Sequence, residues 1–338
     1  MKKFISLVLV VFILFSHSAC RGRDEEDDII RVGMVTDTGG INDGSFNQTS
    51  WAGLEKAEKE LGIEINYLES KTDADYETNI ETFLDEEFDL IIGVGYMLAS
   101  AIREAAIDNP DRKFAIIDDS TNADLPNVAC LMFRQEQAAY LVGYVAGLAT
   151  VSNNVGFVLG MSTGLMNRFG YGFAAGVTDA NPTARIQMAN ANAFTDPSQG
   201  RSIATSMITN GADVLFHAAG GTGLGMIEAC KEANIMAIGA DSDQSKLAPA
   251  NIITSALKRV DTASYEVAKS VAENRYQGGI IWYDLDSEGV DYVASDLLSE
   301  DIKRAVEEVK AGILSGNIIV PDNQADFEAK YGNIYTLD

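Results

Sequence analysis

The sequence predicts an α/β protein with two lobes, each built around a doubly wound parallel β-sheet. Short apolar runs rich in Val and Ile recur about every 25 residues, and the stretches between them have helical periodicity. The runs are continuously apolar rather than alternating, which is typical of parallel strands that helices cover on both faces. With 338 residues, the chain is long enough for two domains with cores of their own.

Two series of five strands are expected, separated by a helical stretch over 136–150. The first series is RVGMVT (31–36), IEINYLE (63–69), LIIGVG (90–95), KFAIID (113–118) and VACLMF (128–133). The second series is VGFVLG (155–160), RIQMANA (185–191), VLFHAAG (214–220), IMAIGAD (235–241) and IITSALK (252–258). One more amphipathic helix is expected over 299–316. Because both series have the same construction, we expect two lobes of like architecture.

The charge balance excludes one large class of function. The chain has 25 Lys and Arg against 50 Asp and Glu, a net charge of −25. Binding to nucleic acid depends on cationic side chains that release counterions from phosphates, so we expect no nucleic-acid partner. A strongly negative chain also repels its own copies, which favours a monomer.

Residues 1–19 are predicted to be a secretory signal peptide. Lys2 and Lys3 precede an apolar run over 4–15. This run is too short to cross the roughly 30 Å of hydrocarbon in a bilayer, so it is not a spanning helix.

The end of the signal peptide resembles a bacterial lipobox. SAC (18–20) has small residues before a cysteine, although His17 stands where Leu is usual. We expect lipid attachment to Cys20 and a charged, flexible tether over 20–29, with the protein anchored to the cell membrane and facing the periplasm or the cell exterior. The alternative is ordinary cleavage next to an incidental cysteine.

The remaining cysteines and the single mature histidine suggest structural roles. Cys130 and Cys230 fall in a predicted strand and a predicted helix in different halves of the chain, so we expect two buried free thiols. His217 lies in an apolar strand and is expected to be a core residue. One histidine leaves few options for a metal site or for acid–base chemistry. We expect no metal, no cofactor and no catalytic residue.

In open parallel sheets, ligands bind beyond the carboxyl ends of the strands. The first strand is followed by a polar, glycine-rich loop in which Ser45 and Gln48 have the spacing of a capping box. That spacing would place Phe46 and Asn47 in the first turn of a helix, with the Phe46 ring at the mouth of a cleft. A hydrophobic lid on the helix start is the alternative role for this ring.

Other predicted strand ends carry similar signals. Asp118 ends one strand, where it either binds a ligand or caps a turn, and Phe194 lies between a strand and a helix. AAGGTG (218–223) combines a strand end with a glycine loop whose N–H groups suit a ligand oxygen. Asp241 and Lys258 end two further strands. A lysine at an apolar strand end needs a partner, and we expect Asp241 to be that partner.

These strand ends together suit a planar, hydrogen-bonding ligand. Each aromatic ring that stacks on such a ligand contributes about 0.5 to 1.5 kcal/mol beyond area burial. Carboxylates accept hydrogen bonds from hydroxyl and N–H groups, at about 1.5 to 3 kcal/mol each, and repel phosphate. Nucleosides therefore fit better than nucleotides.

The sequence resembles the basic membrane protein family of bacterial lipoproteins, whose best-understood members are purine nucleoside-binding components of ABC transporters. The resemblance runs from about residue 31 to residue 322. Its motifs, in the family's order, are VTDTGGINDGSFNQ (35–48) followed by Trp51, AAGGTG (218–223), GADSDQ (239–244) and SALKR (255–259). The resemblance implies a type I periplasmic-binding-protein fold, in which two lobes joined by a hinge enclose the ligand.

The resemblance also implies eight ligand-binding residues. They are two rings that would sandwich the base (Phe46 and Phe194), three groups that would read its polar edge (Asp37, Asn47 and Asp118), a ribose pair (Asp241 and Lys258) and one backbone contact (Gly221). The implied partners are a purine nucleoside and the permease and ATPase subunits of a transporter. Lobe 1 would comprise 30–133 and 259–280, and lobe 2 would comprise 134–258 and 281–338.

Two alternative functions stay open. A receptor of the same fold could take a sugar or another small solute. TDTGGIND (36–43) is also similar to the Asp-rich calcium loop of inosine–uridine nucleoside hydrolases, but Thr36 stands where a ligating Asp would be and an extra Gly precedes Ile41. Without a metal-activated water or a general base, hydrolysis lacks its nucleophile. We therefore expect a nucleoside receptor and not an enzyme.

Overall fold

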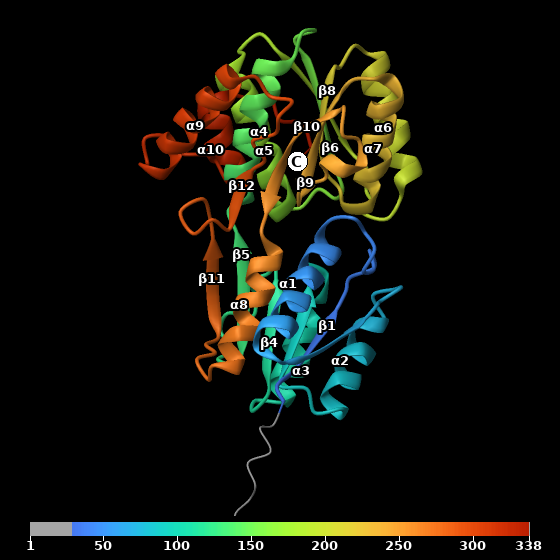
Figure 1. The fold of residues 1–338 in the computed structure, drawn as a ribbon, viewed down its shortest axis with the longest axis vertical. Coiled ribbons are helices and arrows are strands. Elements are labelled where there is room, and N and C mark those ends of the chain that lie inside the picture. Colours follow the sequence, from blue (N-terminus) through green and yellow to red (C-terminus); the bar gives the residue numbers. More distant parts are fainter. Residues whose placement is uncertain (1–28, 338) are drawn as a thin grey trace, which may run out of the picture.

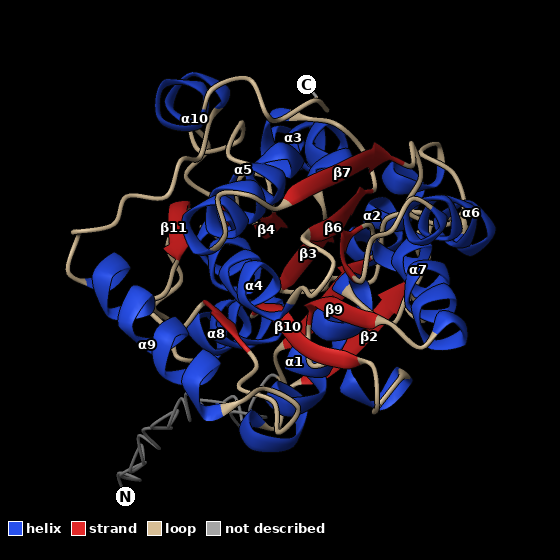
Figure 2. Ribbon diagram, turned by 90° about the horizontal axis from the view of Figure 1, so that it is seen from above, coloured by secondary structure: helices blue, strands red, loops and turns tan. Residues whose placement is uncertain are grey.

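The computed structural model describes residues 29–337, which form two lobes stacked along the long axis of the molecule (Figure 1). Each lobe contains a six-stranded sheet, and helices lie on both sides of the strands (Figure 2). The predicted signal peptide, Cys20 and all of the tether except its last residue lie outside the described residues. Among the helices described, none is long and apolar enough to cross a membrane.

The lower lobe contains a fully parallel sheet with the strand order β11-β5-β4-β3-β1-β2. Its strands are β1 (Arg31–Val35), β2 (Glu64–Leu68), β3 (Leu90–Val94), β4 (Lys113–Ile117), β5 (Val128–Phe133) and β11 (Gly279–Tyr283). Two pairs of helices pack together here, α1 (Phe46–Leu61) with α8 (Val260–Ala272) and α2 (Asp75–Asp85) with α3 (Ala99–Asp108). A short 3-10 turn, η1 (Tyr96–Leu98), follows β3.

The upper lobe contains a sheet with the strand order β12-β10-β9-β8-β6-β7. Its strands are β6 (Asn154–Leu159), β7 (Arg185–Asn190), β8 (Val214–Ala218), β9 (Met236–Asp241), β10 (Ile252–Lys258) and β12 (Val290–Tyr292). Helices α4 (Gln135–Ala149) and α5 (Gly164–Ala180) pack together, as do α6 (Pro197–Thr209) and α7 (Gly220–Ala233). Helix α9 (Glu300–Leu314) packs on α4, and α10 (Gln324–Tyr331) packs on α5. A second 3-10 turn, η2 (Ser245–Leu247), follows β9.

All ten predicted strands are present, but each sheet has one more strand than expected. β11 lies at the edge of the lower sheet, where Ile280, Ile281 and Trp282 are 38 to 46% exposed, so its position differs from that of the buried strands. β12 has three residues and pairs antiparallel with β10, which makes the upper sheet mixed rather than parallel.

Within the described chain, the backbone passes between the sheets three times, after β5, after β10 and after β11. The three connecting segments are joined by backbone hydrogen bonds, because Arg134 N donates to Tyr283 O at 2.8 Å and Arg259 N donates to Gly289 O at 2.9 Å. β11 pairs with β5 as far as Tyr283, so the boundary between lobe 1 and lobe 2 that was expected after residue 280 falls inside this strand.

Three expectations about single side chains are confirmed. Cys130 in β5 and Cys230 in α7 are buried free thiols. His217 in β8 is fully buried and belongs to the interior of the upper lobe.

Candidate ligand-binding site

A cavity lies between the lobes, where the carboxyl ends of both sheets face each other. It contains about 620 Å³ of empty space, including its opening to solvent. All eight residues implied by the resemblance line it: Asp37, Phe46, Asn47, Asp118, Phe194, Gly221, Asp241 and Lys258. Side chains that are far apart in the sequence therefore lie at one cavity, as expected for residues at the carboxyl ends of parallel strands.

Several other lining residues were not expected from the sequence. Tyr96 and Met97 follow β3, so the same strand-end rule could have found them. Met166 and Phe169 lie in the first two turns of α5 rather than at a strand end, and only the packing of this helix brings them to the cavity. They extend the apolar part of the wall beside Phe46 and Phe194.

The loop before α1 is organised by Asp43, not by the expected capping box. Its carboxylate accepts hydrogen bonds from the backbone N–H groups of Ser45, Asn47 and Gln48, at 3.0, 2.8 and 3.1 Å. The capping-box prediction for Ser45 and Gln48 is wrong, because Asp43 already satisfies these helix-start donors and Ser45 makes no side-chain cap. The Ser45 hydroxyl donates instead to the Asp241 carboxylate in the other lobe.

The Asn47 side chain is oriented by two carboxylates. Its Nδ2 donates to Asp37 Oδ1 at 2.7 Å and to Asp43 Oδ2 at 3.1 Å, so both N–H donors are used. Its Oδ1 is buried and has no hydrogen-bond partner within the described chain. Asn47 therefore offers an acceptor, and no free donor, to the cavity that it lines.

Asp37 lies in the same network. Its Oδ1 also accepts from Gly39 N at 2.8 Å. Burial raises the pKa of Asp37 to about 6, although the hydrogen bonds from Asn47 and Gly39 lower it. The pKa of this carboxyl group therefore lies well above the ordinary range of an aspartate.

Lys258 pairs with Asp118 rather than with Asp241. Its Nζ contacts Asp118 Oδ2, and both side chains are buried. The prediction that Lys258 pairs with Asp241 is wrong, because the Lys258 ammonium contacts Asp118 while Asp241 Oδ2 accepts a hydrogen bond from Ser45. The same ammonium lies 4.8 Å from the centre of the Phe46 ring, within cation–π range.

Asp118 offers a ligand an acceptor oxygen, and Asp241 has a raised pKa. Asp118 Oδ1 is buried with no partner among residues 29–337, so it is available as an acceptor. Burial raises the pKa of Asp241 to about 6, and the nearby Lys258 charge offsets only part of this effect. A ligand hydroxyl that donates to Asp241 would replace some of the hydration that burial removes.

The two predicted stacking rings come from different lobes. Phe46 begins α1 of the lower lobe, and Phe194 follows β7 of the upper lobe. Phe194 rests on Gly160, where a Cβ atom would come within 2.3 Å of its ring. Both rings line the cavity.

Within residues 29–337, no group of three or more His, Cys, Asp or Glu side chains is arranged to hold a metal ion. In the loop that is similar to a calcium loop, Asp37 and Asp43 both accept hydrogen bonds from Asn47.

Comparison with known proteins identifies the family. A model of the Bmp family, described as PnrA-like ABC transporter substrate-binding proteins, matches residues 30–324. The chain belongs to this family. The resemblance seen in the motifs is therefore confirmed.

Relatives of this Bmp protein match over nearly their whole length. It is 41% identical over 324 residues to the CD4+ T-cell-stimulating antigen of Listeria innocua, covering 89% of this chain and 90% of the relative. It is 32% identical over 328 residues to the ABC transporter nucleoside-binding protein BmpA of Lactococcus lactis, covering 90% and 93%.

A solved structure supports the same assignment. An ABC transporter solute-binding protein from Aeropyrum pernix superimposes with a TM-score of 0.82 at 29% identity, covering 90% of this chain and 98% of that one. The two-lobed periplasmic-binding-protein fold is confirmed. The protein is thus the substrate-binding component of an ABC transporter, which takes up a solute and acts with permease and ATPase subunits.

Proposed function

We propose that this Bmp protein captures purine nucleosides, such as guanosine, adenosine and inosine, between its lobes and delivers them to a permease. The observation that carries the proposal is the composition of the cavity lining. It joins aromatic rings from both lobes to buried acceptor oxygens of Asn47 and Asp118 that have no partner in the described chain. A planar heterocycle with N–H groups on its edge satisfies both features.

The rings and acceptors would hold the base. Stacking on Phe46 and Phe194 suits any purine, because every base has a flat π-face. Asn47 Oδ1 and Asp118 Oδ1 accept hydrogen bonds and do not donate, so they select a ligand edge that carries N–H donors. A buried acceptor without a hydrogen-bond partner costs free energy. A ligand that donates to these oxygens removes that cost, whereas an apolar ligand that excludes water does not.

Asp241 and Lys258 would hold the ribose. A carboxylate accepts from vicinal hydroxyls, and an ammonium donates to a hydroxyl or ring oxygen. A nucleotide phosphate would meet the four lining carboxyl groups of Asp37, Asp43, Asp118 and Asp241 with only Lys258 to offset them. The site therefore favours nucleosides over nucleotides.

The relative from Lactococcus lactis supports this substrate class, because its name describes it as nucleoside-binding. The hydrogen bonds at Asp37 and Asp43 favour capture over hydrolysis, since their carboxylates orient Asn47 and the start of α1. A sugar receptor is the remaining rival, because sugars also stack on rings. Sugar hydroxyls also donate to the buried acceptors, so the feature that favours a nucleoside is the flat π-face of its base, which a sugar lacks.

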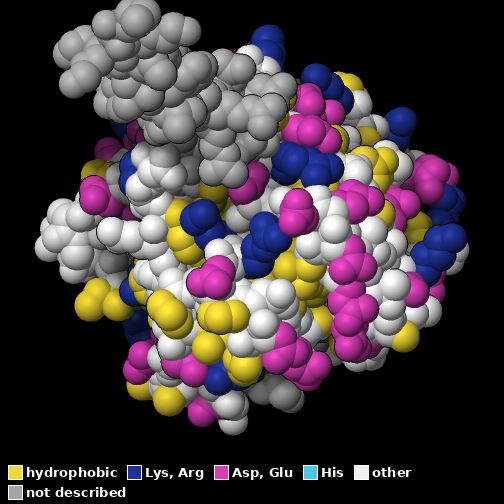
Figure 3. Space-filling view, turned by 90° about the horizontal axis from the view of Figure 1, so that it is seen from below, with side chains coloured by type: hydrophobic (Ala, Val, Ile, Leu, Met, Phe, Trp, Pro, Cys, Tyr) yellow, Lys and Arg dark blue, Asp and Glu magenta, His cyan; other side chains and the backbone are white. Residues whose placement is uncertain are grey.

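We further propose that the protein is a monomer anchored to the cell membrane by lipid on Cys20 and facing the periplasm or the cell exterior. The described chain begins at the far end of the lower lobe, beyond β1 (Figure 1). Lys and Arg side chains are mixed with Asp and Glu on that end (Figure 3). Such a mixed surface has little attraction for anionic headgroups, so attachment would depend on the lipid.

Calorimetry with the purified mature protein tests the substrate class. We expect binding of guanosine, adenosine and inosine, and little or none of GMP, ribose or arabinose. Mass spectrometry of gently purified protein should find a nucleoside. Ribose or arabinose binding without nucleoside binding would replace the proposal with the sugar receptor. Release of hypoxanthine from inosine would replace it with the hydrolase.

A further inference from the structure

We propose that Gln244 is a positioning residue that keeps the lobes closed on the ligand without contacting it, an inference that rests on the proposed capture between lobes. Gln244 follows β9 in the upper lobe and is 3% exposed. Its Nε2 donates to Gly44 O at 2.9 Å, in the loop between β1 and α1 of the lower lobe. In Figure 1 this loop reaches up to the upper lobe. Gln244 is not among the residues that line the cavity.

The orientation of the Gln244 amide is fixed from within the upper lobe. Its Oε1 accepts from Ala240 N at 3.0 Å and lies 3.0 Å from His217 Nε2. His217 Nδ1 is buried with no partner in the described chain, and burial lowers the His217 pKa to about 4. The neutral ring is therefore best satisfied with its proton on Nε2, donating to Gln244. With two donors on Oε1, the amide nitrogen has to face Gly44.

The bond to Gly44 holds the segment that carries ligand contacts. Gly44 lies directly before Ser45, Phe46 and Asn47, and the last two line the cavity. The Ser45 hydroxyl makes a second cross-lobe hydrogen bond to Asp241. Opening the lobes breaks both bonds and exposes the buried amide of Gln244 to water. The cross-lobe bond therefore stabilises the closed state specifically, and its loss should act on ligand release.

Gln244→Glu isolates this bond. The variant keeps an oxygen for Ala240 and His217 but replaces the cross-lobe donor with a second oxygen facing Gly44 O. In stopped-flow measurements we expect the guanosine dissociation rate constant to rise about tenfold, equivalent to about 1.4 kcal/mol. We expect the association rate constant to stay within about twofold and the melting temperature without ligand to be unchanged.

Gln48→Glu is the control for charge, because it introduces the same charge on an exposed side chain in the first turn of α1, close in sequence to Gly44. We expect wild-type rate constants for this variant. An unchanged dissociation rate in Gln244→Glu, or an equal rise in Gln48→Glu, would overturn the proposal. So would a fall in the melting temperature of Gln244→Glu with equal changes in both rate constants, because that result indicates a general structural role.

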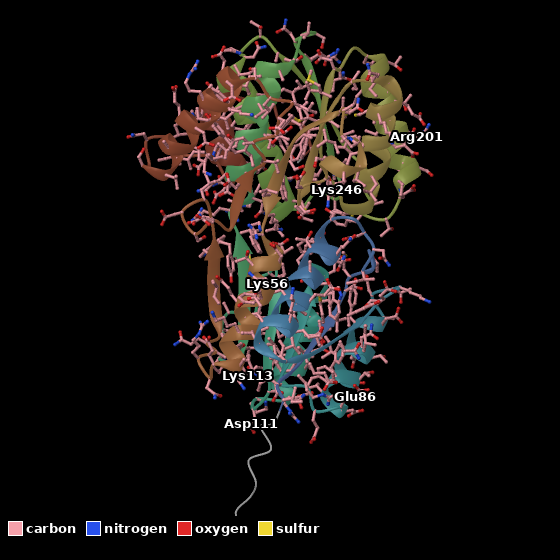
Figure 4. The ribbon with its side chains drawn as sticks, in the orientation of Figure 1. Lys56, Glu86, Asp111, Lys113, Arg201 and Lys246 are labelled. Atoms are coloured by element: carbon pink, nitrogen blue, oxygen red, sulfur yellow. The ribbon has the colours of Figure 1, made fainter. Side chains whose placement is uncertain are left out.

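A distance measurement separates this inference from the proposed substrate. Spin labels at Glu86→Cys and Ser202→Cys report lobe separation, since both positions are exposed and lie on opposite lobes, the latter beside Arg201 (Figure 4). Without ligand, we expect Gln244→Glu to reduce the short-distance population about tenfold. If guanosine does not bind the wild type, the substrate proposal fails while these distances still decide the role of Gln244. Identical distance distributions would then refute it.

Discussion

Asp118 and Asp241 occupy corresponding positions in the two lobes, and both have a left-handed backbone, with φ of 66° and 64°. Asp118 directly follows β4, and Asp241 is the last residue of β9. A non-glycine residue in this region costs about 1 to 3 kcal/mol, and such strain concentrates at functional sites. Both carboxylates line the cavity, so the left-handed backbone occurs at two residues of the candidate site.

Asp241 should contribute more to the binding of nucleosides than to the binding of free bases. We expect Asp241→Ala to weaken binding of guanosine and inosine about 10- to 100-fold, because a charged hydrogen bond contributes about 1.5 to 3 kcal/mol. Guanine and hypoxanthine should lose less than about threefold, since they have no ribose. Isothermal titration calorimetry on the variant measures both. Equal losses for bases and nucleosides would refute the ribose role of Asp241.

Stacking on Phe194 should not depend on which purine is bound. We expect Phe194→Ala to weaken guanosine, adenosine and inosine alike by at least about tenfold, because stacking of about 0.5 to 1.5 kcal/mol is lost together with apolar contact. Phe194→Tyr keeps the ring and should retain most of the affinity. Calorimetry with the three nucleosides is the measurement, and a loss confined to one of them would contradict the stacking role.

The acceptor oxygens of Asn47 and Asp118 should select among purines. Guanosine presents two adjacent N–H donors on its base edge, whereas adenosine and inosine present one donor position each. We expect guanosine to bind about tenfold tighter than adenosine in the wild type, and Asn47→Ala to reduce this preference. Competition binding with both nucleosides tests the ratio. A wild-type preference for adenosine would show that these oxygens do not read the base edge.

Binding and stability should respond oppositely to acid. Burial raises the pKa values of Asp37 and Asp241 to about 6, above the ordinary 3.8, so the folded protein favours their protonated forms. Their contribution to the stability of the ligand-free protein therefore increases as the pH falls from about 7 toward 4. Protonation of either carboxylate leaves the protein with one acceptor fewer for the N–H and O–H groups of the ligand. Nucleoside affinity should therefore fall as the pH drops through about 6.

Melting temperatures and dissociation constants measured between pH 8 and pH 5 test both trends. Asp241→Asn is the control, because it cannot titrate, and it should show a shallower rise in melting temperature on acidification. Affinity that increases in acid would mean that the ligand prefers a protonated carboxyl group.

Attachment to the membrane should depend on Cys20. We expect wild-type protein to fractionate with membranes and Cys20→Ser to be released into the soluble fraction, because a single apolar leader is removed on cleavage. Immunoblotting of the fractions is sufficient. A Cys20→Ser protein that stays with the membranes would show that another element holds it there.

Much of the fold could be predicted from the sequence because buried parallel strands leave an unambiguous pattern. All ten predicted apolar runs form strands, and residues at or just after their carboxyl ends line the cavity. β12 spans three residues, too few to show a periodic pattern. β11 was missed although its sequence, GIIWY, is typical of a strand, and its half-exposed place at the sheet edge is visible only in the structure.

The pairing of charges could not be predicted. Asp43 caps α1 although Ser45 and Gln48 have the spacing of a capping box, because a carboxylate two residues upstream accepts three N–H groups at once. Lys258 had two carboxylates within reach in the folded chain, and only the three-dimensional arrangement assigns it to Asp118. Met166 and Phe169 reach the cavity through helix packing, for which no local sequence signal exists.

The three passages between lobes also bear on biosynthesis. A ribosome that has made residues 29–258 has produced five strands of each sheet, but β11 of the lower sheet and β12 of the upper sheet are still missing. Neither lobe is a continuous segment, so no single truncation yields one lobe intact. Both sheets are complete only when the polypeptide has been synthesised past Tyr292, and the upper lobe still lacks α9 and α10 at that point, which delays native structure until late in translation.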